Sequence, residues 1–420
     1  MENPSSKYCF GDLIELQLDS IAFGGEAVAR LDGLVIFVEG GIDGEKVLAE
    51  VIQVKKKFLR ARVKEILEPS SHRIKPSCSV FGECGGCQYQ HIDYPHQLKI
   101  KENQVRDALE RIGRLKDFEI EPIIGSSQAY GYRSRVDFHV VRDRDEIKIG
   151  FVNRSNESVI DVDHCPITSP QINQAYQMLR QKILKGEDHI PEWTQGIKFW
   201  ETENGVEEFF LSHCGKVDLR GFEFISLKVD GKTFKVPPLS FFQVNLETIP
   251  FLIQCVRDFL ELKGDEFLLD TYCGVGLFGV FLGSKVRKCV GVESDESAIS
   301  FAKINAQENG LSNCKFVEKS VEKFLKQGKK DLGESPDRII LDPTRAGCTP
   351  SVLESLVTLG TPQVVYVSCN PTTLARDLSF LVKKRYHLDR IQPIDLFPQT
   401  QHCEVVVSLK IQNSKIKIQN

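Results

Sequence analysis

Residues 364–371 read VVYVSCNP and place a cysteine where chemistry is expected. The β-branched and aromatic run predicts a buried strand, and the turn after it contains Cys369. In an open α/β sheet, ligands bind at the carboxyl ends of the strands, so we expect Cys369 at a ligand site. A thiol there can act as a nucleophile when its surroundings favour the thiolate. For any single cysteine, a small buried core residue is the plain alternative.

A glycine-rich turn follows another predicted strand. Residues 274–279 read GVGLFG, which is G-x-G-x-x-G, and they come after the apolar strand Glu266–Asp270 and open a helix. Glu293 ends the next strand, 23 residues after Asp270, where a carboxylate can hold ribose hydroxyls. This pattern predicts a cofactor that carries a nucleoside. By itself it fits a dinucleotide as well as S-adenosylmethionine.

Four cysteines form a second candidate site. Cys78, Cys84 and Cys87 lie in CSVFGECGGC, and Cys165 follows in a His-Cys-Pro sequence. The glycine pair between Cys84 and Cys87 lets two thiolates converge without steric cost. Four thiolates satisfy either a tetrahedral zinc ion or a [4Fe–4S] cluster, and the spacing does not choose between them. The spacing also leaves the fourth ligand open between Cys165 and Cys9.

One reaction uses a nucleoside cofactor, a thiol at a strand end and a separate carboxylate, namely methylation of a pyrimidine at C5. That carbon becomes nucleophilic only after a thiolate adds to C6, and C5 then takes the methyl group from S-adenosylmethionine. A base must afterwards remove the C5 proton so that the thiol can leave. Cys369 is the predicted nucleophile. Glu404, near the beginning of the predicted strand HCEVVVSLK, is the predicted base.

The composition is that of an ordinary globular protein. The 420 residues, 41% hydrophobic and 27% charged, are enough for two or three domains with a large core. No run of 18 apolar residues exists, and the first residues lack the apolar core of a signal peptide, so we expect a cytoplasmic protein without a membrane segment. The 13 cysteines over this length favour thiols, metal ligands or catalysis over a disulfide scaffold.

The elements that position these residues are expected to form three domains, and the predicted fold class is multidomain α/β. Residues 1–66 contain short alternating strands broken by glycines, which is typical of a small β-barrel of the oligonucleotide-binding type. Residues 67–236 are expected to form a central α+β domain, in which arginines alternate with aromatic residues as on a surface for single-stranded RNA. Residues 237–420 alternate helices with apolar strands, which predicts a Rossmann-like domain with a mostly parallel sheet.

The charge is unevenly distributed along the chain, although the net charge is only -4. Residues 1–45 carry nine acidic and two basic side chains, whereas residues 46–75 carry nine basic and three acidic ones. A basic stretch of this kind can bind phosphates, but a solvated strand face explains it equally well.

Together these motifs resemble the RNA (uracil-5-)-methyltransferase family over nearly the whole chain, from about Tyr8 to Lys410. The likeness is to the bacterial 23S rRNA enzymes that have a TRAM domain and a [4Fe–4S] cluster. It implies that the barrel is a TRAM domain and that the cluster ligands include Cys165 as the fourth. The set is Cys78, Cys84, Cys87 and Cys165. The sequence SCNP matches the nucleophile motif around Cys369, and Glu404 lies where the family has its proton-abstracting glutamate.

The family's contacts to S-adenosylmethionine fall on four residues of this chain. They are Gln243 in FFQVN, Tyr272 in DTYCGVG, Glu293 in VGVE and Asp342 in DPTRAG. The resemblance implies that Glu293 holds the ribose, that Tyr272 forms an aromatic wall, and that the other two lie near the methionyl end. The RNA cytosine-5 methyltransferases are similar in fold but carry a second cysteine after the proline of an Asp-x-Pro motif. Here Thr344 follows Asp342-Pro343, which favours uracil.

The resemblance therefore implies S-adenosylmethionine-dependent methylation of uridine C5 in RNA. The 23S rRNA is favoured, because members with both a TRAM domain and the cluster mostly act on it. A tRNA uracil-5 methyltransferase and a catalytically silent iron–sulfur RNA-binding protein are the alternatives. A nicotinamide-dependent oxidoreductase would leave Cys369 and Glu404 without a role. We expect structured RNA as the partner, no obligate protein partner, and a structural cluster.

Overall fold

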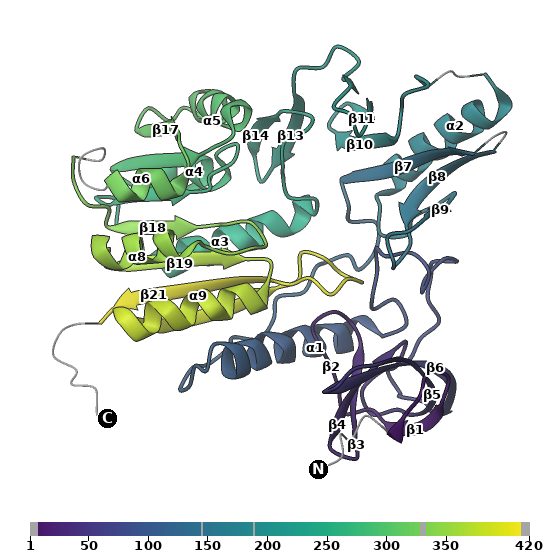
Figure 1. Ribbon diagram of the computed structural model, residues 1–420. Helices are drawn as coiled ribbons and strands as arrows, with labels where there is room; N and C mark the ends of the chain where they lie inside the picture. The colour runs from purple at the N-terminus through teal and green to yellow at the C-terminus, as the bar shows by residue number, and fades with distance from the viewer. Residues whose placement is uncertain (1–6, 144–145, 188–189, 328–332, 413–420) are drawn as a thin grey trace.

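The computed structural model describes residues 7–143, 146–187, 190–327 and 333–412 (Figure 1). Residues 1–6 and 413–420, at the ends of the first and third expected domains, lie outside the described residues. None of the helices in the described ranges combines the length and the apolar character that crossing a bilayer requires.

The N-terminal strands form a curled sheet with a core of its own, which lies beside α1 in Figure 1. Its order is β1-β5-β6-β4-β3-β2. In β4 and β5 every second side chain is buried, because successive residues of a strand point to opposite faces. The barrel expected from the sequence is confirmed, and it includes a strand of only two residues, β2. The strands are β1 (Leu13–Gln17), β2 (Ser20–Ile21), β3 (Ala27–Leu31), β4 (Leu34–Glu39), β5 (Lys46–Val54) and β6 (Phe58–Glu68).

Helix α1 (Tyr94–Asp107) leads from the barrel to the C-terminal sheet (Figure 1). The side chain of Asp93 caps it by accepting a hydrogen bond from the backbone N–H of His96 at 3.0 Å. The helix continues into a π-helical segment, Ala108–Ile112. Val105 is fully buried in the same core as the sheet, so α1 covers one face of a sheet that lies far along the chain.

The central part of the chain forms an antiparallel sheet covered by a helix. Its strand order is β12-β11-β10-β7-β8-β9. Tyr176 of α2 (Pro170–Lys185) stacks on Phe138 with ring centroids 4.0 Å apart, and both side chains are buried. The strands are β7 (Arg135–Asp143), β8 (Glu146–Val152), β9 (Val159–Asp161), β10 (Gly196–Thr202), β11 (Gly205–Leu211) and β12 (Val217–Asp218).

The C-terminal sheet has the order β17-β16-β15-β18-β19-β21-β20. Its first five strands are parallel, and β21 pairs antiparallel with both β19 and β20. Strands β15 and β19 are buried along their whole length, as expected for a parallel sheet with helices on both faces. The strands are β15 (Phe267–Thr271), β16 (Lys288–Glu293), β17 (Cys314–Glu318), β18 (Arg338–Leu341), β19 (Gln363–Ser368), β20 (Tyr386–Ile394) and β21 (Glu404–Ile411).

Two groups of helices cover the two faces of this sheet and enclose separate cores. On one face lie α3 (Ile249–Leu260), α4 (Leu277–Leu282) and α5 (Glu296–Glu308). On the other face, with α1, lie α6 (Val321–Gln327), α8 (Pro350–Leu359) and α9 (Pro371–Lys384). The mostly parallel, doubly covered sheet expected from the sequence is therefore present.

A hairpin that precedes Pro237 also packs on this sheet. Strands β13 (Ile225–Val229) and β14 (Lys232–Val236) bury their apolar side chains in the core that α3 covers. The backbone N–H of Lys235 donates to Asn305 Oδ1 at 2.7 Å, and Asn305 Nδ2 donates back to the carbonyl of Lys235 at 3.0 Å. The hairpin thus packs with the C-terminal sheet, although it comes before the position where the sequence predicts the last domain to begin.

Gly150 in β8 is where the central sheet tolerates a side chain least, because a Cβ there would lie 1.9 Å from the carbonyl oxygen of Ile160. We expect Gly150→Ala to lower the free energy of unfolding by about 1–3 kcal/mol through overpacking, measured by urea denaturation. The control is Gly196→Ala in β10, where the nearest atom would be 3.5 Å away. It should change the free energy by less than about 0.5 kcal/mol. Equal midpoints for the two variants would contradict this reading of the packing.

Candidate active site

Five of the predicted residues lie at one edge of the C-terminal sheet. Four are at the carboxyl ends of parallel strands, and the fifth is at the start of the antiparallel strand β21. Thr271 pairs with Val292 on one side and with Leu341 on the other. The residues that follow these positions therefore lie next to one another. Along the edge, in strand order, come Glu293 of β16, Tyr272 after β15, Asp342 after β18, Cys369 after β19 and Glu404 of β21.

Cys369 and Glu404 face each other across the β19–β21 pair. Ser368 is the register partner of Val405, and because the two strands are antiparallel the next position sets Cys369 opposite Glu404. Glu404 is buried and Cys369 is half-buried. The two residues that the sequence predicts as nucleophile and base are thus neighbours in space, although 34 positions separate them in the chain.

The turn that carries Cys369 is fixed by the start of helix α9. Asn370 caps the helix, since its Oδ1 accepts hydrogen bonds from the backbone N–H of Thr372 at 3.0 Å and from its hydroxyl at 2.7 Å. Asn370 Nδ2 and Thr373 Oγ1 both donate to the carbonyl of Arg345, at 3.2 and 3.1 Å. The loop after β18 is therefore tied to the turn after β19, and Cys369 is held next to Arg345.

The pKa of Cys369 is raised to about 11, mainly by burial and in part by the carboxyl groups of Glu404 and Asp342. Arg345 acts in the opposite direction, through its charge and through a hydrogen bond to the thiol. The thiol is consequently protonated at neutral pH, and Arg345 is the nearby group that favours the thiolate.

The carboxyl groups of Asp342 and Glu404 at this edge also hold protons more tightly than usual. Burial raises the pKa of Asp342 to about 7. Burial, and to a smaller extent the charge of Asp342, raises the pKa of Glu404 well above its ordinary value, while Arg345 lowers it. A carboxylate with a raised pKa is a stronger base than an exposed one, so Glu404 is suited to accept a proton at neutral pH.

Two buried oxygens of the C-terminal part of the chain have no hydrogen-bond donor among the described residues. Gln243, in the segment before α3, is 6% exposed, and its Oε1 is unpaired. Asp270, at the end of β15, is fully buried; its Oδ2 accepts from the backbone N–H of Gly279 at 3.1 Å, but its Oδ1 is unpaired. An unpaired buried acceptor is costly, so a bound molecule that supplies donors is the natural partner for both.

The glycine turn has the strained geometry of a ligand site. Tyr272 has a φ of +60°, in the left-handed region. Bulky residues rarely adopt this conformation, and those that do are often found at functional sites. Gly276 has φ +88°, and a Cβ there would lie 3.2 Å from the ring of Phe316. The backbone N–H of Gly274 donates to Glu293 Oε2 at 3.3 Å, which joins the turn to the carboxylate at the end of β16.

The four cysteines of the second candidate site line one cavity of about 100 Å³. They are Cys78, Cys84, Cys87 and Cys165. The pKa of Cys87 is raised to about 12, mainly by burial and in part by the charge of Cys165. Cys9, the alternative fourth ligand, is exposed and does not line this cavity. In the ranges that the structure describes, no group of three or more His, Cys, Asp or Glu side chains is arranged to hold a single metal ion.

Sequence reasoning did not include Arg345 or Asp270 among the site residues. Arg345 is exposed, and its role became visible only when α9 brought its loop beside Cys369. Asp270 gave a local signal, because it is an acidic residue at the end of an otherwise apolar strand.

The chain is similar to known methyltransferases over almost its full length. Residues 222–412 match the family model described as tRNA (uracil-5-)-methyltransferase, and residues 10–64 match the TRAM domain. An uncharacterized RNA methyltransferase of Nostoc sp. is 32% identical over 96% of this chain and 97% of its own length. One of Clostridium acetobutylicum is 33% identical over 94% of this chain and 96% of its own. The chain belongs to the RNA (uracil-5-)-methyltransferase family.

A solved structure of this family has the same arrangement. The crystal structure of Pyrococcus abyssi tRNA (uracil-54, C5)-methyltransferase, in complex with S-adenosyl-L-homocysteine, superposes with a TM-score of 0.72 at 25% identity. The similarity covers 94% of this chain and 100% of that one. The family resemblance drawn from the motifs is therefore confirmed, and the N-terminal barrel of this RNA methyltransferase is a TRAM domain.

The electrostatics of the site predict how Cys369 reacts with an alkylating agent. Glu404→Gln removes a negative charge that raises the pKa of Cys369, so iodoacetamide should label Cys369 faster at mildly alkaline pH. Arg345→Gln removes the group that lowers this pKa and should slow the labelling. Peptide mass spectrometry separates Cys369 from the other cysteines, and the exposed Cys9 provides the internal reference. Glu404→Gln labelling no faster than wild type would contradict the assigned electrostatics.

Proposed function

We propose that this RNA methyltransferase methylates C5 of uridine, with Cys369 as nucleophile and Glu404 as general base. The observation that carries the proposal is their opposition across β19 and β21, within reach of Arg345 and Asp342. C5 methylation of a pyrimidine needs a thiol and a base on the same nucleotide, and this edge of the sheet supplies both.

The methyl donor in this proposal is S-adenosylmethionine, which supplies an electrophilic methyl group. The buried, unpaired Oε1 of Gln243 is suited to accept a hydrogen bond from the donor's ammonium group. Glu293 would hold the ribose hydroxyls, Tyr272 would cover the adenosine, and Asp342 would complete the polar contacts near the reacting end. The complex of the Pyrococcus relative with S-adenosyl-L-homocysteine supports this assignment.

Three side chains of the protein, Arg345, Cys369 and Glu404, take part in the steps of the proposed reaction. Cys369 first gives its proton to water, and Arg345 stabilises the resulting thiolate. The thiolate forms a bond to C6 of the uracil, and the electron pair of the C5–C6 double bond moves toward C5 and the O4 oxygen. C5 then forms its bond to the methyl group while the bond between that methyl group and the donor's sulfonium sulfur breaks, which leaves the donor as a neutral thioether. Glu404 takes the remaining C5 proton, the double bond re-forms and the bond from sulfur to C6 breaks. Glu404 ends protonated, which its raised pKa allows at neutral pH.

The four cysteines are proposed to hold a [4Fe–4S] cluster. A zinc ion would hold its thiolates only about 3.8 Å apart, whereas a cluster occupies a cavity between them. The cysteines surround such a cavity. Arg133 Nε and Thr168 Oγ1, from two residues that line the cavity, are buried polar atoms without a partner in the described part of the chain. Thiolate and sulfide sulfurs of an anionic cluster would accept hydrogen bonds from both.

The proposed substrate is structured RNA, with 23S rRNA as the first candidate. Four arginines line a groove of about 500 Å³ between the TRAM domain and the cysteine site, where they can contact phosphates. They are Arg60, Arg62, Arg73 and Arg154. The combination of a TRAM domain with a cysteine site supports rRNA. The full-length likeness to the Pyrococcus tRNA enzyme supports tRNA as the second candidate.

The decisive experiment is transfer of a labelled methyl group from S-adenosylmethionine to 23S rRNA and to unmodified tRNA, followed by mapping of 5-methyluridine. We expect label at one or more uridines of 23S rRNA, and none with Cys369→Ala. Cys214→Ser, at an exposed cysteine far from both sites along the chain, is the control and should retain wild-type activity. Label only in tRNA would overturn the rRNA assignment. Wild-type activity of Cys369→Ala would overturn the mechanism.

The cluster is tested on protein purified without oxygen. We expect about four iron and four sulfide per chain and a broad visible absorbance, because four thiolates complete a [4Fe–4S] cluster. Cys84→Ser should lose most of the iron, whereas Cys214→Ser should keep it. One zinc per chain with no sulfide would contradict the proposal.

A further inference from the structure

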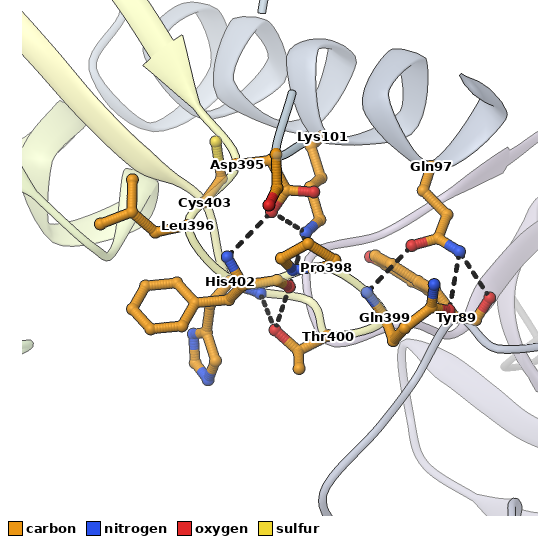
Figure 2. Close-up of polar contacts among 12 residues, drawn as sticks. Tyr89, Gln97, Lys101, Asp395, Leu396, Pro398, Gln399, Thr400, His402 and Cys403 are labelled. Carbon is orange, nitrogen blue, oxygen red and sulfur yellow. Dashed lines mark hydrogen bonds and ion pairs between the residues drawn. The ribbon is translucent and has the colours of Figure 1, made fainter. Parts of the chain in front are cut away.

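The segment between β20 and β21, residues 395–403, is fixed by contacts from separate parts of the chain (Figure 2). We call it the 395–403 loop. Four consecutive carbonyl groups of this loop each accept a hydrogen bond from a different segment of the chain. Leu396 accepts from Asn245 Nδ2 at 3.2 Å, Phe397 from Lys101 Nζ at 3.0 Å, Pro398 from the Tyr132 hydroxyl at 3.0 Å, and Gln399 from the backbone N–H groups of Gln88 and Tyr89 at 3.0 Å.

A fully buried ion pair anchors the first residue of the loop. Lys101 Nζ of α1 lies 2.6 Å from Asp395 Oδ1, and both side chains are completely buried. The same oxygen of Asp395 accepts from the backbone N–H of Phe397 at 3.1 Å. Taking two charges out of water is expensive, so the pair is weak evidence for stability. Its fixed geometry is better explained as a means of holding the loop in one conformation.

Gln399 holds the middle of the loop in a strained conformation. Its φ of +69° is in the left-handed region, which persists in a residue other than glycine only where the surroundings over-determine it. Gln97, one turn before Lys101 on α1, donates from Nε2 to Gln399 Oε1 at 2.9 Å and accepts from the backbone N–H of Gln399 at 3.1 Å. Figure 2 shows Lys101 and Gln97 reaching the loop from the same helix.

Glu404 directly follows the loop as the first residue of β21. Ile394, the residue before the loop, pairs with Glu404, the residue after it, so the two ends of the loop meet at this pair. A movement of the loop would therefore move the first residue of β21 relative to β19, on which Cys369 lies. Cys369 itself is held by the Asn370 and Thr373 contacts to Arg345, which do not involve the loop.

We propose that Lys101, through Asp395, and Gln97, through Gln399, position Glu404 for removal of the C5 proton. They are positioning residues of the last step and leave addition of Cys369 and methyl transfer intact. The inference rests on the proposed function. It has a chemical consequence: when Glu404 is displaced, C5 keeps its proton and the bond from Cys369 to C6 cannot break. Methylated RNA then stays covalently attached to the protein.

Two variants test the proposal. Lys101→Met combined with Asp395→Asn removes both charges, so no unpaired charge is left buried. Gln97→Leu leaves the ion pair in place and removes the contacts to Gln399, together with the hydrogen bonds that Gln97 Nε2 donates to the carbonyls of Tyr89 at 3.1 Å and Ile92 at 2.8 Å. In both, methyl label should enter RNA in the first turnover, while release of free methylated RNA slows about 100-fold, the usual cost of misplacing a reacting group by about 1 Å. The retained RNA should migrate with the protein on a denaturing gel.

A matched control uses another ion pair, on the strand that leads into the loop. Arg390 of β20 lies 2.8 Å from Glu121, but this pair is partly exposed. Glu121→Gln should therefore release methylated RNA at the wild-type rate. Urea midpoints identify any variant that is unfolded rather than mispositioned, and Gln97→Leu keeps the test open if the double variant does not fold.

Glu404→Gln separates failure of this inference from failure of the proposed function. That variant should trap methylated RNA in full, and its failure to do so would overturn the assigned base and the positioning role with it. If Glu404→Gln traps RNA but the folded Lys101→Met/Asp395→Asn and Gln97→Leu variants release it at the wild-type rate, the positioning role is wrong. Loss of methyl transfer without any adduct in these variants would also overturn it.

Discussion

The antiparallel strand β21, inserted between β19 and β20, is the constraint on which the site depends. Parallel strands present their last residues at the carboxyl edge of a sheet, whereas an antiparallel strand presents its first residue there. Glu404 is the first residue of β21 and Cys369 follows the last residue of β19, so a single pairing brings a carboxyl and a thiol together. Shifting this register by one residue would turn Glu404 to the other face of the sheet.

Burial then gives the paired groups their chemistry. Glu404, Asp342 and Cys369 all have raised pKa values, and Arg345 is the cation that opposes the increase for Glu404 and Cys369. Hydrogen bonds tie the loop after β18 to the start of α9. They keep Arg345 close to Cys369, and the electrostatic effect of Arg345 on the thiol weakens with distance.

The modules of the chain are joined through the C-terminal sheet. Helix α1 packs on one face of that sheet and the β13–β14 hairpin on the other, and both come from earlier parts of the chain. The segment after Cys87 donates two backbone hydrogen bonds to Gln399 in the 395–403 loop. The cysteine site and Glu404 are thus separated by a short hydrogen-bonded path. Through this path the proposed cluster would be linked to the loop that precedes Glu404.

Local patterns in the sequence were enough to predict much of this protein. Apolar runs that end in polar residues located the strands and placed Cys369, Asp342 and Glu293 at their ends, and the glycine turn and the cysteine spacing marked two candidate ligand sites. The strand positions were confirmed, because strand periodicity and turn chemistry are properties of neighbouring residues. Glu404 was predicted as the base from the reaction that the other motifs require, and the family resemblance supported the same residue.

Only the tertiary structure decided which of these groups meet and how their pKa values shift. Lys101 looks like a surface cation of a polar helix, and no local pattern shows that it is buried against Asp395, 294 residues away. Arg345, Gln97 and Gln399 likewise gain their roles from segments far along the chain. Desolvation and hydrogen bonding depend on the complete surroundings of a group, and those surroundings are assembled only when the sheet and its helices have packed.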